Sequence, residues 1–127
     1  MHKNAEIVRR AYEAFNTADL MTLTELFDEK AAWHTPGRGA RAGDRTGRDA
    51  VFAQFGHYLQ DTAGTFRATL QHVFADDDGR VVALHHNSDT RAGKTLDSDC
   101  YIVFQLKDGR ITDAREHYYD LYNWNQF

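Results

Sequence analysis

The hydrophobic pattern of the sequence changes its period at Gly64, and this change constrains the fold more than any other feature. Before Gly64, apolar residues recur every three or four positions in three segments, residues 5–16, 20–27 and 51–59. This spacing is typical of one face of an α-helix. After Gly64, apolar and polar residues alternate, as they do in β-strands. The sequence therefore predicts helices first and a sheet afterwards.

Four strands are predicted after Gly64, because turn sequences divide this part of the chain at residues 76–79 (DDDG), 91–94 (RAGK) and 107–110 (KDGR). Short turns join neighbouring antiparallel strands, so the four strands should form an antiparallel meander. In the first of them, one face is expected to carry Phe66, Ala68, Leu70, His72 and Phe74.

An earlier strand is predicted at residues 30–37 (KAAWHTPG), followed by a loop or short hairpin at residues 37–45, which are rich in glycine and arginine. Asp19 is expected to cap the second helix. Thr46 and Asp49 have the spacing of a capping box for the third helix, with Asp in place of Glu.

The expected fold class is α+β, with the helices covering one face of the sheet to bury their apolar sides. At 127 residues with 42% apolar content, the chain fits one domain, residues 1–127, with one core.

Composition excludes several classes of function. A formal charge of −4 with interspersed signs gives no basic stripe for nucleic acid. No apolar run reaches membrane-spanning length and the first residues do not resemble a signal peptide, so a soluble, cytoplasmic protein is expected. Cys100 is the single cysteine. Adjacent His85 and His86 should point to opposite faces of a strand, so they do not predict a metal site. No cofactor is predicted either.

Four motifs follow one another along the chain: Asp19 between two helices, then WHTPG, TGRDAV and DGRITDAREHYYD. With these motifs, the chain resembles the SnoaL-like branch of the nuclear transport factor 2-like superfamily over essentially its whole length. The resemblance implies a cystatin-like fold, in which a curved antiparallel sheet forms a cone and helices close one side of a pocket. It also implies that the aromatic side chains among residues 118–127 line or cover this pocket. Ketosteroid isomerase, limonene epoxide hydrolase, scytalone dehydratase and polyketide cyclases share this fold.

The residues that ketosteroid isomerase uses are poorly matched. At the position of its catalytic base this chain has Thr35, and at the position of its tyrosine it has Ala11, next to Tyr12. The position of its second aspartate corresponds to Tyr101 or Cys100. The resemblance therefore does not imply steroid isomerisation by the usual residues.

Other members of the superfamily match better. Asp89 and Glu116 match the two acids of limonene epoxide hydrolase, but Asn87 stands where that enzyme has an arginine. SnoaL-like cyclases resemble this chain through an aspartate near the end of the last strand, which Asp120 matches.

Strand alternation gives an independent grouping. Glu116 should share a face with Tyr118 and Asp120, and Asp89 with Asn87. If Thr35 faces the pocket then Trp33 does too, and His34 points away unless a bulge or Pro36 turns it inward.

The leading hypothesis is a metal-free acid–base isomerase, cyclase or dehydratase acting on a small apolar or polyketide-like molecule. Glu116, Asp120 or Asp89 would move a proton, with help from Tyr101 or His34. The remaining residues expected to contact the ligand are Trp33, Thr35, Tyr12, Phe55, Asn87, Tyr118 and Trp124.

Two alternatives stay open: a non-catalytic ligand-binding or dimerisation module, and an epoxide or lactone hydrolase. A homodimer is expected in each case, because helices on one face of a curved sheet leave the other face exposed.

Overall fold

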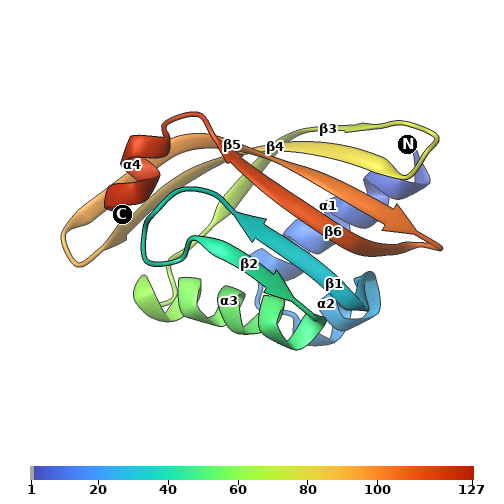
Figure 1. The fold of residues 1–127 in the computed structure, drawn as a ribbon, viewed down its shortest axis with the longest axis horizontal. Coiled ribbons are helices and arrows are strands. Elements are labelled where there is room, and N and C mark those ends of the chain that lie inside the picture. The colour runs from blue at the N-terminus through green and yellow to red at the C-terminus, as the bar shows by residue number, and fades with distance from the viewer. Residues whose placement is uncertain (1) are drawn as a thin grey trace.

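A computed structural model describes residues 2–127 of the chain. Figure 1 shows a curved sheet with helices on one side and a further short helix near the C-terminus. The helices are α1 (Lys3–Asn16), α2 (Leu20–Leu26), α3 (Arg48–Asp61) and α4 (Leu121–Gln126). The strands are β1 (Phe27–Thr35), β2 (Gly43–Thr46), β3 (Ala68–Ala75), β4 (Arg80–Arg91), β5 (Lys94–Lys107) and β6 (Arg110–Tyr118).

The strands form one six-stranded sheet in the order β2-β1-β6-β5-β4-β3. Strands β3 to β6 form the predicted antiparallel meander, and β1 joins it by running parallel to β6. The loop or hairpin expected after β1 is a hairpin, in which β2 pairs with β1. The predicted α+β fold class is confirmed.

The start of α3 differs from the prediction. Asp19 caps α2 as expected and accepts a hydrogen bond from the backbone N–H of Thr22 at 3.2 Å. The N-cap of α3, however, is Gly47, which has no side chain to cap the helix. The predicted capping box is therefore wrong: Thr46 lies one position too early, in β2, where it pairs with Ala32.

A second correction concerns β3. The pairing of β3 with β4 shifts between Leu70 and His72, which is the signature of a β-bulge. Because the bulge adds one residue, the alternation of faces reverses after it. Val73 and Ala75 then pack against the core, and the side chain of Phe74 is 64% exposed.

The core lies between the inner face of the sheet and helices α1 to α3 (Figure 1). The opposite, outer face of the sheet includes Tyr101, which is 46% exposed. Within residues 2–127, no helix is both long and apolar enough to cross a membrane.

Candidate active site

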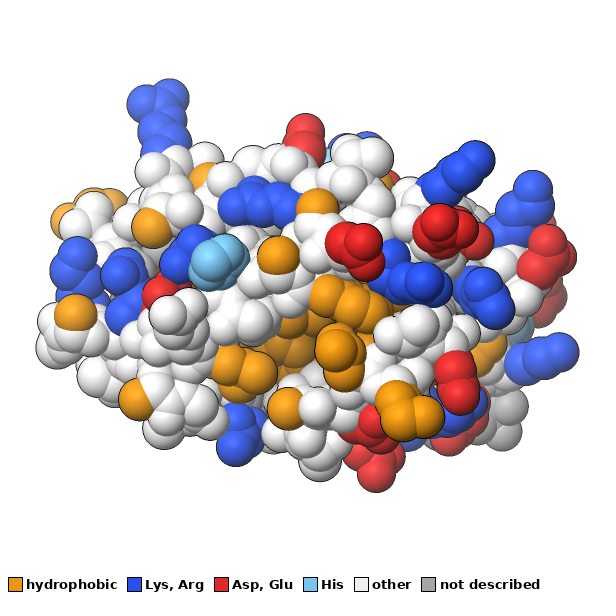
Figure 2. All heavy atoms as spheres, turned by 90° about the horizontal axis from the view of Figure 1, so that it is seen from below, with side chains coloured by type: hydrophobic (Ala, Val, Ile, Leu, Met, Phe, Trp, Pro, Cys, Tyr) orange, Lys and Arg blue, Asp and Glu red, His pale blue; other side chains and the backbone are white. Residues whose placement is uncertain are grey.

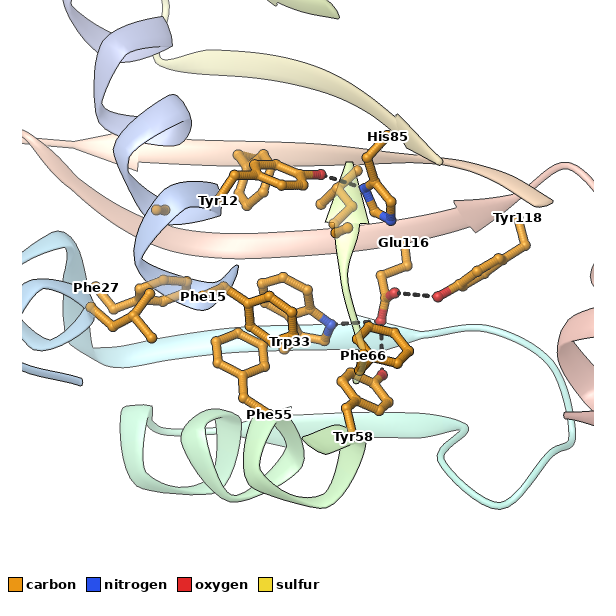
Figure 3. Close-up of a pocket in the computed structure, with 15 residues that line it drawn as sticks. Tyr12, Phe15, Phe27, Trp33, Phe55, Tyr58, Phe66, His85, Glu116 and Tyr118 are labelled. Carbon is orange, nitrogen blue, oxygen red and sulfur yellow. Dashed lines mark hydrogen bonds between the residues drawn. The ribbon is translucent and has the colours of Figure 1, made fainter. Parts of the chain in front are cut away.

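The inner face of the sheet and the three helices line a partly open cavity of about 50 Å³. This volume accommodates several water molecules. Most of the lining side chains are aromatic, and they come from α1, β1, α3, β5, β6 and the segment before β3 (Figure 3): Tyr12, Phe15, Phe27, Trp33, Phe55, Tyr58, Phe66, Phe104 and Tyr118.

On the helix side of the molecule, hydrophobic side chains lie in a hollow surrounded by charged side chains (Figure 2). The cavity lies under this side, since α1, α2 and α3 all contribute to its wall. An apolar cavity with a few polar groups is the usual form of a small-molecule site.

Among the residues that the structure describes, Glu116 on β6 is the one that brings a carboxyl group into the cavity wall, and it is 5% exposed. Its Oε1 atom accepts hydrogen bonds from Trp33 Nε1 at 2.7 Å, Thr35 Oγ1 at 2.7 Å and the Tyr58 hydroxyl at 3.4 Å. Its Oε2 atom accepts a hydrogen bond from the Tyr118 hydroxyl at 3.1 Å (Figure 3). The two oxygens therefore have different surroundings.

Burial raises the pKa of Glu116 above its ordinary value, because removal from water disfavours the charged carboxylate. The four hydrogen-bond donors lower the pKa again, but only in part. The Trp33 indole can only donate, so Oε1 must remain an acceptor. The proton of the neutral acid therefore belongs on Oε2, where the Tyr118 hydroxyl can accept it.

Local strand geometry explains this arrangement. Trp33 and Thr35 are two residues apart on β1 and therefore point to the same face. Strand β1 runs beside β6, with Trp33 paired to Ala114 and His34 to Arg115, so this face meets Glu116.

A second polar group lines the cavity on another side. The Tyr12 hydroxyl from α1 lies 2.6 Å from Nδ1 of His85 on β4 (Figure 3). Nε2 of His85 lies 3.0 Å from Oδ1 of Asn87, which is fully buried. Burial is the main cause that lowers the pKa of His85 to about 4.

Two of the predicted acids lie apart from Glu116. Asp89 is buried, but its carboxylate accepts a hydrogen bond from the backbone N–H of Arg67 at 3.0 Å, and it does not line the cavity. Asp120 is exposed and caps α4 through the backbone N–H of Asn123 at 2.9 Å. The expectation that Asp120 continues the inner face of β6 is wrong, because the strand ends at Tyr118.

Tyr101 and His34 point away from the cavity. Tyr101 stacks on His117 on the outer face, with ring centroids 5.1 Å apart. The bulge in β1 lies before Ala32, so alternation holds from Trp33 onward and His34 also faces outward. Its two ring nitrogens each lie 2.8 Å from a carboxylate, of Asp44 and of Asp113. The prediction that these two residues assist in the pocket is wrong.

The other predicted ligand contacts lie at or near the cavity. The side chains of Tyr12, Trp33, Phe55 and Tyr118 line the cavity. Thr35 and Asn87 do not line it, but they form hydrogen bonds with Glu116 and His85, which do. Trp124 lies behind Tyr118 and lines a smaller cavity of about 20 Å³. Tyr58 and Phe66 border both cavities, and their stacked rings separate the two.

Sequence reasoning did not select Tyr58 or His85. Tyr58 falls within the predicted helical segment 51–59, and the apolar spacing of that segment does not reveal that its hydroxyl reaches Glu116. His85 was considered only as a possible metal ligand, although strand alternation puts it on the same face of β4 as Asn87. Among the residues that the structure describes, no three His, Cys, Asp or Glu side chains are grouped so that they could hold a metal ion.

Known proteins are similar to this chain in fold and in sequence. A family model described as a SnoaL-like domain matches residues 8–114. Bal32a from a soil-derived mobile gene cassette is 60% identical, with a TM-score of 0.96 over 98% of this chain and 95% of Bal32a. The uncharacterised protein Rv0034 of Mycobacterium tuberculosis is 37% identical over 91% of this chain and 88% of its own. IdmH of Streptomyces antibioticus, described as a putative polyketide cyclase, is 21% identical, with a TM-score of 0.80 over 98% of each chain.

Proposed function

The chain belongs to the SnoaL-like family, and we propose that it is an enzyme that transfers a proton on a small, largely apolar molecule bound in the cavity. The observation that carries this proposal is the buried Glu116, whose carboxyl group forms part of an otherwise mostly aromatic wall. Isomerisation, cyclisation and dehydration all need such a transfer.

The surroundings of Glu116 suit a general acid or base. A carboxyl group whose pKa is raised toward neutral pH exchanges protons more readily under physiological conditions. Since three donors hold Oε1, Oε2 is the oxygen that would exchange the proton. The neutral acid would donate to a carbonyl oxygen of the ligand, and the carboxylate would take the proton back when the product forms.

The wall favours a flat, unsaturated ligand. Aromatic side chains stack on planar rings and conjugated carbonyl systems and exclude water from them. Polyketide-like ring systems have this chemistry. The description of IdmH as a putative polyketide cyclase agrees with this ligand class, although the likeness between the two chains is one of fold.

A non-catalytic binding protein is the second candidate. It is favoured by the fact that protein donors already satisfy both oxygens of Glu116, as expected for a purely structural buried acid. The epoxide hydrolase alternative is weaker, since neither Asn87 nor Asp89 lines the cavity.

Hydrogen–deuterium exchange of a ketone tests the proposal. 2-Tetralone is a bicyclic ketone with acidic hydrogens next to its carbonyl. In D₂O, the wild-type protein should speed the loss of their ¹H NMR signals above the buffer rate. Glu116→Gln keeps the side-chain shape and should lower this acceleration by about a hundredfold, a typical contribution of a general acid or base.

His57→Gln, a change on the exposed side of α3, is the control and should exchange as the wild type does. Binding of 2-tetralone without accelerated exchange would favour the binding protein. Equal acceleration by wild type and Glu116→Gln would contradict the enzyme proposed here.

A further inference from the structure

We propose that Tyr12, His85 and Asn87 form a second proton-transfer group in the cavity, in which Tyr12 accepts a proton from the ligand while its own hydroxyl proton passes to Nδ1 of His85. The proposal rests on the function proposed above, in which Glu116 acts on the oxygen of the ligand. It assigns the opposite step, removal of a proton from the ligand, to a different part of the wall.

Hydrogen bonds define which nitrogen of His85 carries the hydrogen. Nδ2 of Asn87 donates to the backbone carbonyl of Arg67 at 3.1 Å. Because a carbonyl can only accept, the amide of Asn87 cannot be reversed, and its Oδ1 atom faces Nε2 of His85. Nε2 must therefore be the protonated nitrogen.

The other nitrogen, Nδ1, then has a free lone pair in the neutral ring. It accepts the hydrogen of the Tyr12 hydroxyl over 2.6 Å, a short distance for such a bond. Since this hydroxyl proton is directed at His85, the Tyr12 oxygen can meet a ligand only as an acceptor. In other hydroxyl–imidazole pairs the imidazole takes the hydroxyl proton in this way. In the step proposed here, the Tyr12 oxygen takes up the ligand proton as its own proton leaves.

Burial keeps His85 neutral, with a pKa of about 4, so that Nδ1 is available at neutral pH. Several titratable groups surround this ring. Tyr12 approaches it from α1, Cys100 is its cross-strand neighbour on β5, Glu116 lies on β6, and His86 and Asp99 act from the outer face.

Together, Glu116 and the Tyr12–His85 pair can convert a ketone ligand to its enol without a further reactant. A C–H bond next to the ligand carbonyl breaks, and its proton bonds to the Tyr12 oxygen. The electron pair forms a C=C bond, and the carbonyl oxygen takes the proton from Oε2 of Glu116. The Tyr12 proton has meanwhile moved to Nδ1. The ligand is now an enol, and the imidazolium and carboxylate left in the wall attract each other. Return of the protons, to the same or another carbon, restores both groups.

The first test needs no ligand. In protein with ¹⁵N-labelled histidine, NMR should show His85 with a hydrogen on Nε2 and none on Nδ1. Tyr12→Phe keeps the ring and should shift the Nδ1 signal toward that of a free lone pair, with Nε2 still protonated. Tyr101→Phe removes a phenol on the outer face and is the matched control, without effect. A hydrogen on Nδ1 in the wild type would overturn the proposal.

The second test is the exchange of 2-tetralone. Tyr12→Phe should slow it at least about tenfold, with little change in binding. Loss of exchange in Glu116→Gln but not in Tyr12→Phe would overturn the role of Tyr12 and leave the proposed function intact. If neither variant is slower than the wild type, the proposed function fails as well.

Discussion

The indole ring of Trp124 stacks on the ring of Tyr118, with centroids 4.3 Å apart and planes 5° apart. Trp124 belongs to α4, and its Nε1 atom donates to the backbone carbonyl of Pro36 at 3.1 Å. The C-terminal helix is thereby fixed both to the loop after β1 and to the tyrosine that contacts Glu116. It supports the cavity wall from behind.

Replacing Trp124 by Ala should lower the free energy of unfolding by about 3–5 kcal/mol, the usual cost of truncating a buried tryptophan. Denaturant unfolding measures this value. Tyr122→Ala is the matched control, because Tyr122 lies on the same helix but is 74% exposed, and it should cost far less. Equal effects of the two single substitutions would mean that the stacking contributes little.

Deleting residues 121–127 should also destabilise the protein, and it should increase the binding of hydrophobic dyes.

Much of this arrangement could be predicted from the sequence, because hydrophobic period specifies both the type of an element and its inward face. Alternation correctly grouped Glu116 with Tyr118 and Trp33 with Thr35. These residues lie in strand segments without a bulge, where alternation holds.

The errors have local physical causes. Nothing in the residues of β3 marks its bulge, so Phe74 was placed on the wrong face. Asp120 and Tyr101 match family positions in the sequence, but such a match does not reveal where a strand ends or which face a residue occupies. Tyr58 could not be selected, since the partner of a helical hydroxyl depends on how the helix packs on the sheet.

Acid should destabilise the protein partly through His85. Its pKa is about 4 in the folded state and 6.5 ordinarily, so the unfolded chain binds the proton more tightly. Stability is therefore lost as the pH falls from 6.5 toward 4, by an amount on the order of 3 kcal/mol.

His85→Gln cannot titrate, so its unfolding free energy should fall less over this range. The difference between the wild type and this variant isolates His85, because His34 and His86, whose pKa values are raised, titrate in both proteins. Parallel pH dependence of the two unfolding free energies would contradict a buried, neutral His85.

Thr35→Val should raise the pKa of Glu116 further. The Thr35 hydroxyl donates to Oε1 at 2.7 Å, and this bond favours the charged carboxylate. Valine has the same shape without the donor. NMR titration of the Glu116 carboxyl carbon checks this, with Thr90→Val on the exposed face of β4 as control. A pKa that is unchanged or lower in Thr35→Val would show that the bond does not stabilise the charge.

We expect the protein to be a homodimer that pairs through the outer face of the sheet, where Tyr101 and Phe74 are exposed. Light scattering should give about twice the chain mass of 14.6 kDa. Tyr101→Glu would place a charge in this interface and should favour the monomer. A wild-type mass of one chain at all concentrations would contradict the dimer.

The most direct test of the account is the pKa of Glu116 in the wild-type protein, from the ¹³C NMR shift of its carboxyl carbon as a function of pH. The proposed acid–base role predicts a midpoint above the ordinary value of 4.5, because the carboxyl group is buried in the cavity wall. A midpoint at or below 4.5 would mean that its four donors hold it as a permanent carboxylate. Glu116 would then be a structural acid, and its role in proton transfer would be contradicted.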